Sequence, residues 1–191
     1  MNLSKNSQIY ILIALGLLLL ITRGQHSLIF NQLPSASWAV FFLLGFYITK
    51  KIWFTIFILL AFSIDLYAVT WGGVSNFCVS PAYPFLIPAY GSLWLAGHFY
   101  QKYYIFHLKT IPLLLAVSIG GIVFCELFSS GGFYFLSGRF IDTSMTVFFE
   151  RVVTFFPSYV SSTFFYLSLA MFVHIAFVVV EKYKLNKTRN I

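Results

Sequence analysis

The residues best suited to chemistry lie in one stretch, from Asp65 to Tyr90, between two apolar segments. This stretch combines a carboxylate within an apolar run, a pair of glycines, a cysteine (Cys78) and three prolines. Irregular backbone at membrane depth is tolerated only where it is buried in protein or lines a cavity. We therefore expect the functional site in this stretch.

The sequence leaves three roles open for Cys78. A free cysteine is commonly a small, buried and unreactive residue. Cys78 could instead pair with Cys125, because both lie toward the same, oxidising side. The third role is a reactive or metal-ligating thiolate, favoured by the helix start expected at Ser80-Pro81, whose dipole stabilises the anion. The position of Cys78 in a loop shaped by glycine and proline adds weight to this third role.

Asp65 is the strongest single indication of a site. An ionisable group inside a membrane span is energetically costly and marks a functional position by default, with a partner to be named. Arg151, expected on the same side of the membrane, is the predicted charged partner. The alternative is that Asp65 lies at a helix end capped by loop amides, with Arg151 as an interfacial anchor.

Composition places the chain in a membrane. Of its 191 residues 60% are hydrophobic and 9% are charged, whereas soluble domains carry roughly 25% charged residues. The net charge of +7 comes from short basic runs between apolar segments, not from the basic stripe that nucleic acid requires. No nucleic-acid partner is therefore expected, and without a GxxxxGK[ST] motif no nucleotide hydrolysis of the P-loop kind either.

Six apolar segments predict six transmembrane helices in a single domain over residues 1–191. The predicted spans are Ile9–Ile21, Trp38–Thr49, Ile52–Thr70, Pro81–Tyr100, Pro112–Phe128 and Ser158–Val180. A short additional helix is expected to begin near Asp142 and to end near Pro157, where a proline interrupts helical hydrogen bonding.

Charge counting orients these spans. Nine basic residues fall on one side and three on the other, and the excess marks the cytoplasmic side. The nine are Lys5, Lys50, Lys51, Lys102, Lys109, Lys182, Lys184, Lys187 and Arg189, and the three are Arg23, Arg139 and Arg151. The prediction is a multi-pass protein with both termini in the cytoplasm.

This orientation gathers most polar candidates at the outer face, namely His26, Asp65, Cys78, Tyr83, Cys125, Glu126, Glu150 and Arg151. Tyr83, Tyr90 and Trp94 share one face of the fourth span, where they either floor a flat ligand or pack against another helix. His26 is either a solvated loop histidine or part of the site. His174, inside the sixth span, is expected to be a hydrogen-bonded core residue.

At FCVSPAYPFLIPAY the chain resembles the BtuM family of bacterial vitamin B12 transporters, which are solitary relatives of the S-components of energy-coupling factor (ECF) transporters. The resemblance extends over nearly the whole chain in length, span number and order of polar residues. It implies an all-α, S-component-like bundle of six helices in the bacterial inner membrane. The implied function is uptake of cobalamin, held in a periplasm-facing pocket.

The resemblance also implies roles for individual residues. In that family a cysteine of the same loop binds the cobalt of cobalamin, and its counterpart is Cys78. The other pocket residues map onto His26, Asp65, Tyr83 and Arg151. The family is associated with decyanation of cyanocobalamin, and a thiolate is a soft ligand suited to a transition metal. The arginine fork suits the phosphate or amide carbonyls of cobalamin.

The first helix departs from the pattern of many S-components, which carry Ala-x-x-x-Ala there. Ala14 has Tyr10 four residues before it and Leu18 four residues after it, so the groove that admits a partner helix is missing. A dedicated energising module is therefore not expected, in agreement with a solitary protein.

Two other functions stay open at this point. One is an intramembrane cysteine transpeptidase or protease of the exosortase type, with Cys78 as nucleophile, Arg151 stabilising the oxyanion and a histidine as base. Only His26 lies on the outer side near Cys78, which weakens this hypothesis. The other is a structural membrane subunit held by a Cys78–Cys125 disulfide.

Overall fold

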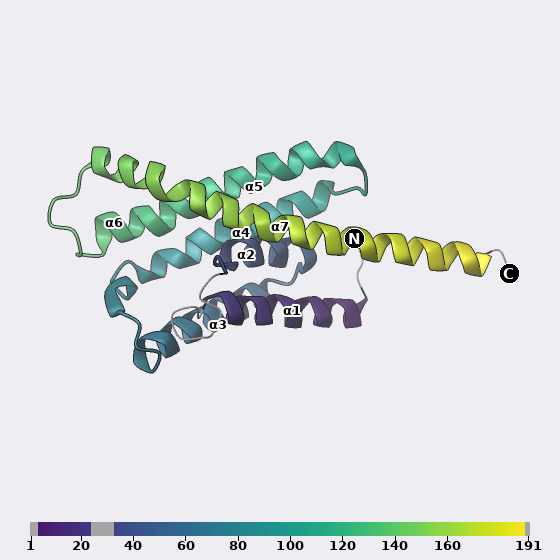
Figure 1. Ribbon diagram of the computed structural model, residues 1–191, viewed down its shortest axis with the longest axis horizontal. Helices are drawn as coiled ribbons and strands as arrows, with labels where there is room; N and C mark the ends of the chain where they lie inside the picture. The colour runs from purple at the N-terminus through teal and green to yellow at the C-terminus, as the bar shows by residue number, and fades with distance from the viewer. Residues whose placement is uncertain (1–3, 24–32, 190–191) are drawn as a thin grey trace.

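The computed structural model describes residues 4–23 and 33–189, which form helices joined by turns and loops, with no β-strand among them. Figure 1 shows the helices packed side by side as an elongated bundle, with α7 extending beyond the others at one end. In chain order the elements are α1 (Lys5–Arg23), α2 (Ser37–Tyr47), α3 (Lys51–Thr70), η1 (Asn76–Cys78), η2 (Tyr83–Phe85), α4 (Leu86–Tyr103), η3 (Leu108–Thr110), α5 (Ile111–Glu126), the π-helical turn η4 (Leu127–Gly131), α6 (Gly132–Leu136) and α7 (Met145–Arg189).

Four helical segments are long and apolar enough to cross a membrane. They are Lys5–Arg23, Lys51–Thr70, Leu108–Leu136 and Met145–Val180. Their outward faces carry large exposed hydrophobic side chains such as Leu17, Phe62 and Phe172, which water would not accept over so wide an area. The predicted all-α architecture is therefore confirmed, with four helical segments whose length and composition suit a membrane.

The second predicted span is a short helix in the centre of the protein. The 11 residues of α2 make a helix about 16 Å long, whereas a bilayer core is about 30 Å thick. Almost every α2 side chain is buried. Hydrogen bonds to α1 and α7 hold its start, because Ala36 N donates to Thr22 Oγ1 at 3.1 Å and the Tyr166 hydroxyl donates to Pro34 O at 2.7 Å.

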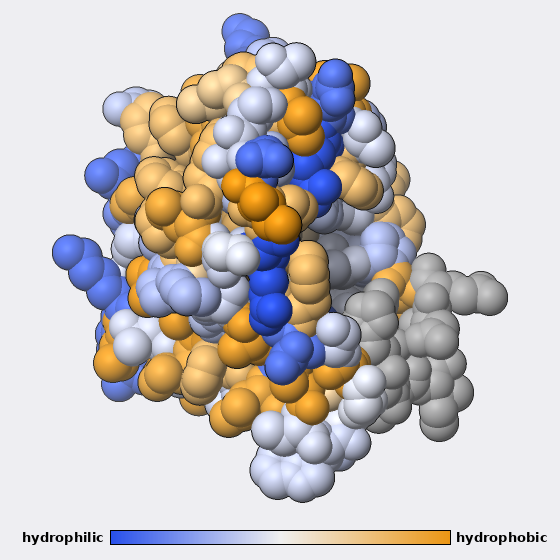
Figure 2. Space-filling view, turned by 90° about the vertical axis from the view of Figure 1, so that its left-hand side faces the viewer, coloured by the Kyte–Doolittle hydropathy of each residue, from blue (hydrophilic) through white to orange (hydrophobic). Residues whose placement is uncertain are grey.

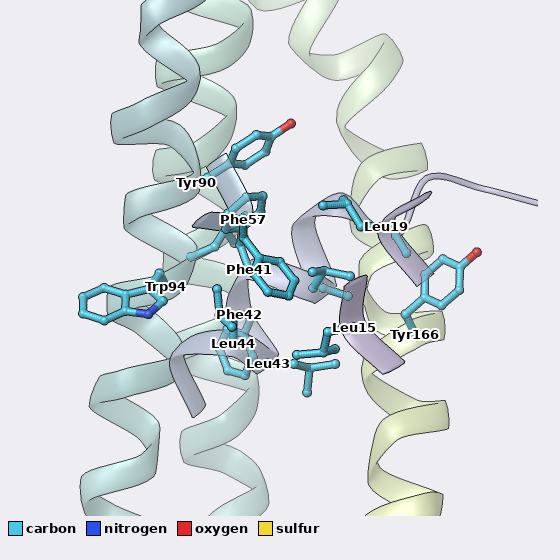
Figure 3. Packing of buried hydrophobic residues seen from close by; sticks show 14 of the residues in the cluster. Leu15, Leu19, Phe41, Phe42, Leu43, Leu44, Phe57, Tyr90, Trp94 and Tyr166 are labelled. Carbon is cyan, nitrogen blue, oxygen red and sulfur yellow. The ribbon is translucent and has the colours of Figure 1, made fainter. Parts of the chain in front are cut away.

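The core forms around α2, as Figure 3 shows. Phe41 stacks on Tyr90 of α4 with ring centroids 4.3 Å apart. Two glycines let the backbones of α2 and α4 touch: a Cβ on Gly45 would collide with the carbonyl of Trp94, and a Cβ on Gly97 would collide with the carbonyl of Phe42. Small residues at such crossings are a usual device of membrane helices, because close approach increases van der Waals contact.

Three predicted helix boundaries are wrong. The fourth span begins at Leu86 instead of Pro81, because residues 81–85 form a turn and the 3₁₀-helix η2. The fifth continues past Phe128 through η4 and α6 to Leu136. No short helix ends at Pro157, since α7 runs through that proline without a break. Neighbouring turns of a long apolar helix can absorb the missing hydrogen bond, so a proline need not end it.

The two ends of the bundle differ in chemistry. The end that carries η1, η2 and the α6–α7 connection (residues 137–144) is called the loop end below, and it lies on the left in Figure 1. The opposite end carries Lys50, Lys51, Lys102 and Lys109, all exposed, and is called the lysine end. Figure 2 views the loop end, where hydrophilic residues form a narrow band between hydrophobic ones.

Candidate functional site

A two-point ion pair joins α1 to α3 at the loop end. Arg23 Nε lies 2.7 Å from Asp65 Oδ1, and Arg23 Nη2 lies 2.6 Å from Asp65 Oδ2. The arginine side chain is 11% exposed and the aspartate 26%, so both charges are largely withdrawn from solvent. Arg23 is the last residue of α1, where the helix dipole also favours a cation.

The predicted pairing of Asp65 with Arg151 is therefore wrong. The fold brings the ends of α1 and α3 together, and the planar guanidinium of Arg23 matches the carboxylate with two parallel hydrogen bonds. Arg23 was assigned to the outer side by charge counting, but its sequence context gave no sign of a partner 42 residues away.

Three hydroxyl groups complete a network around this ion pair. Arg23 Nη1 donates to the Tyr90 hydroxyl at 2.6 Å and to Ser37 Oγ at 3.1 Å. The Tyr83 hydroxyl donates to Asp65 Oδ2 at 2.7 Å. These five residues, from α1, α2, α3, η2 and α4, are called the Arg23 cluster below. The hydroxyl of Tyr90 points away from the hydrophobic core in Figure 3.

Tyr83 links this cluster to the loop that carries the cysteine. Burial and the hydrogen bond to Asp65 raise the pKa of the Tyr83 hydroxyl, so it stays protonated and remains a donor to the carboxylate. Because Asp65 accepts three hydrogen bonds from its neighbours, it acts in this structure as an anchor that fixes η2. The cluster can therefore hold the approach to α4 in place.

Cys78 is the last residue of the one-turn helix η1. The hydroxyl of Ser75 caps the start of this helix by accepting a hydrogen bond from Phe77 N at 3.2 Å. The predicted helix start at Ser80 is not found there, and η2 follows at Tyr83. The side chain of Cys78 is outside the described part of the structure, as is the whole of His26. Their predicted roles in ligand binding stay predictions.

An arginine that the sequence did not single out holds the Cys78 turn. Arg139 Nη2 lies 3.2 Å from Asn76 O and 3.4 Å from Val79 O, the carbonyls that bracket Phe77 and Cys78. Its guanidinium also lies over the Phe77 ring, 5.4 Å from the centroid. Gly138, with φ of 69°, provides the left-handed turn just before Arg139. Arg139 thus fastens the cysteine turn to the α6–α7 connection.

Replacing Arg139 by glutamine is expected to loosen this turn while leaving the bundle folded. The loss of charge-assisted contacts to two carbonyls should ease local opening by about 1–2 kcal/mol. We therefore expect a maleimide to alkylate Cys78 about tenfold faster. Mass spectrometry of the labelled peptide measures this rate. Buried Cys125 should stay unlabelled, and Arg151→Gln at the same end serves as the matched control. Equal rates in the wild type and in Arg139→Gln would contradict the clamp.

Arg151 lies among aromatic rings. Its guanidinium is 4.9 Å from the centroid of Phe140, 5.6 Å from that of Phe155 and 5.8 Å from that of Tyr134. Such cation–π contacts hold the side chain at the loop end but use the faces of the rings, not hydrogen-bond acceptors. The structure places Arg151 apart from the Arg23 cluster, in agreement with the alternative of an interfacial anchor.

Four other residues predicted near the outer side are buried inside the bundle. Tyr90 and Trp94 are buried in the core, so the face that they share packs against α2 and α3 and does not floor a ligand there. Cys125 on α5 is a free, fully buried cysteine, which leaves a structural disulfide to Cys78 without support. Glu126 is buried beside it, and its Oε2 has no hydrogen-bond partner.

The described residues contain no metal site built from several protein side chains. No three histidine, cysteine, aspartate or glutamate side chains come together there in a way that could hold a metal ion. The loop end has instead a cysteine turn that is held by Arg139 and, through η2, by the Arg23 cluster.

Comparison with known proteins adds nothing to this chemistry. No protein-family model matches the sequence, and no curated protein matches it either.

Proposed function

We propose that this protein takes up cobalamin across a bacterial inner membrane, with the corrinoid bound at the loop end and Cys78 as an axial ligand of its cobalt. The observation that carries the proposal is the construction around Cys78. The backbone of Cys78 ends the one-turn helix η1, and Arg139 contacts the carbonyls of Asn76 and Val79 on either side of Phe77 and Cys78. A preorganised thiolate is a fitting ligand for one open position on a transition metal.

Cobalt in a corrin already has its equatorial ligands, so the protein needs to supply a single donor. The Cys78 turn at the loop end would provide that donor. Arg139 lies against the backbone of the same turn, so the proposal places a positive charge beside the loop that carries the ligand.

Decyanation would follow from ligand exchange. The Cys78 sulfur donates its electron pair to cobalt, cyanide leaves with the pair that bound it, and the thiol proton goes to solvent or to the departing cyanide. The oxidation state of the metal is unchanged, so no additional redox partner is required. The metal chemistry belongs to the corrinoid, and the protein provides the position and charge of the sulfur.

The proposal includes a six-span topology with cytoplasmic termini. The four long apolar segments supply four of the crossings. Helix α4, with 18 residues, would supply another, and the segment that contains the short helix α2 would complete the sixth inside the bundle. The described lysines at the lysine end and the arginines Arg23, Arg139 and Arg151 at the loop end support cytoplasmic placement of the lysine end.

Operation without a dedicated energising module is also part of the proposal. The surface of α1 carries large exposed side chains, with Tyr10 71% and Ile13 54% exposed. A partner helix could not approach this face as closely as it approaches a small-residue groove. The lipid bilayer is the expected neighbour of α1.

The absorption spectrum of purified protein incubated with cyanocobalamin tests the function. We expect the wild type to retain the chromophore with bands shifted by thiolate ligation, and Cys78→Ala to lose the shift and to bind at least tenfold more weakly. Cys125→Ser is the matched control and should behave as wild type, because Cys125 is buried in the bundle.

Other results of this experiment would distinguish the transporter from the enzyme and from the structural subunit. Binding with an unshifted spectrum in both proteins would remove the cobalt-ligand role but keep the transport proposal. A folded wild type that binds no corrinoid would overturn the proposal, and peptide hydrolysis or transfer dependent on Cys78 would then support the exosortase-type enzyme. Equal loss in Cys78→Ala and Cys125→Ser would indicate a shared structural role.

A further inference from the structure

A cavity of about 390 Å³ lies at the lysine end, far from the Cys78 turn. It is lined by Ile111 and Leu114 of α5, by Leu167 and Ala170 of α7 and by Phe46 of α2, among others. The rim includes exposed hydrophobic residues, with Leu108 78% and Ile175 39% exposed. The cavity therefore opens to the surface through an apolar edge.

Several polar groups on the cavity wall already have hydrogen-bond partners. The His174 ring lies with Nδ1 3.1 Å from the Tyr47 hydroxyl and Nε2 2.8 Å from the Tyr104 hydroxyl. The prediction that His174 is hydrogen-bonded is thereby confirmed, but the residue is half-buried on the cavity wall and does not belong to the core. Thr110, at the mouth, donates its hydroxyl to the carbonyls of Ile105 and His107. Water would find few free partners in such a space, which suits a hydrocarbon chain better.

Two exposed lysines lie in the segments that contribute residues to the cavity. His107 and Leu108 line it, Lys109 is the next residue in η3, and Lys102 lies in the last turn of α4, both exposed. All four acidic residues whose side chains are described (Asp65, Glu126, Asp142 and Glu150) lie toward the loop end. The two lysines therefore have no described carboxylate at their own end to neutralise them.

We propose that this cavity binds one acyl chain of an anionic phospholipid, with Lys102 and Lys109 attracting its phosphate-bearing headgroup. The apolar walls provide the site for the chain, and the two exposed lysines select the charge of the head. Basic residues at a membrane surface attract anionic lipids by about 1 kcal/mol each, or about fivefold in affinity. This inference is independent of corrinoid binding, since the cavity and the Cys78 turn lie at opposite ends of the bundle.

Native mass spectrometry of the full chain, released from detergent with added lipid, tests the site. The probes are phosphatidylglycerol and phosphatidylcholine with identical acyl chains. We expect one phosphatidylglycerol to be retained, with at least tenfold preference over phosphatidylcholine. Lys102→Gln/Lys109→Gln, which leaves the cavity walls intact, should remove most of this preference while the chain still binds.

A cavity-filling substitution tests the chain. Ala170→Phe places a ring in the cavity and should abolish the retained lipid, whereas Ala176→Phe, on an exposed part of the same helix outside the cavity lining, should not. Retention unaffected by Ala170→Phe, or equal retention of both lipids by the wild type, would overturn the proposal. If Ala170→Phe does not yield folded protein by circular dichroism, the lysine double variant alone decides, because an unchanged lipid preference in it contradicts the headgroup role.

Discussion

Arg23→Gln is expected to destabilise the protein by about 3 kcal/mol. Glutamine removes the cation and both charge-assisted hydrogen bonds to Asp65, so the carboxylate keeps only the Tyr83 hydroxyl as partner. Breaking a buried ion pair costs about 3–5 kcal/mol because the remaining charge is uncompensated. The 26% exposure of Asp65 lets water solvate part of that charge, which favours the lower end of the range.

The free energy of unfolding in mixed micelles, from a denaturant titration followed by circular dichroism, measures this effect. Arg151→Gln is the matched control. It removes an arginine from the same end of the bundle, but one that contacts aromatic rings, and should cost about 1 kcal/mol or less. Similar losses in the two variants would show that the ion pair contributes no more than an interfacial anchor does.

A double-mutant cycle separates the pair from its surroundings. Asp65→Asn alone should be destabilising, because it leaves the Arg23 cation without its anionic partner. The double variant Arg23→Gln/Asp65→Asn should be more stable than the sum of the two single losses predicts, since neither charge is then left alone. Strict additivity would contradict direct coupling between the two residues, whatever the size of the single effects.

Gly97→Ala is the second substitution with a large expected effect. Its new methyl group would meet the carbonyl of Phe42, and the methyl group of Gly45→Ala would meet the carbonyl of Trp94. Overpacking a core by extra methyl groups usually costs about 1–3 kcal/mol. The obstacle here is backbone, which cannot move aside by changing rotamer, so we expect the upper end, about 3 kcal/mol, for each substitution.

Gly120→Ala provides the control for this test. It lies in α5, and a Cβ built on Gly120 meets no other group within 4 Å. Alanine should be neutral there, or stabilising by up to about 1 kcal/mol, because it favours a helix more than glycine does. The same unfolding measurement applies to all three variants. If Gly97→Ala were as stable as Gly120→Ala, close contact of α2 and α4 would not be needed for folding.

Both predictions concern contacts that local sequence does not reveal. The partner of Asp65 depends on where α1 ends relative to α3, and the two residues are separated by 42 positions. Gly45 and Gly97 lie in different helices, and neither belongs to a recognisable motif with the other. Arg139 is likewise a loop arginine whose value appears only when residues 76–79 are folded beside it.

The sequence by itself determined the class of protein and the distribution of charge. Low charge content and long apolar runs require a membrane bundle, because such a chain cannot cover a soluble surface. The separation of Arg23, Arg139 and Arg151 from the lysines also follows from the order of the apolar segments, and the structure places these three arginines at the loop end. The stretch from Asp65 to Tyr90 was correctly predicted to contain irregular backbone.

Only the tertiary structure decided which groups meet. In a helix that is apolar on all sides, the hydrophobic pattern no longer tells the buried face from the lipid-facing one. For this reason the burial of α2, the uninterrupted course of α7 through Pro157 and the continuation of α5 into α6 could not be predicted. The choice of Arg23 over Arg151 has the same origin: hydrogen bonds between distant residues are selected by helix packing, which brings the end of α1 to Asp65 and leaves Arg151 among aromatic rings.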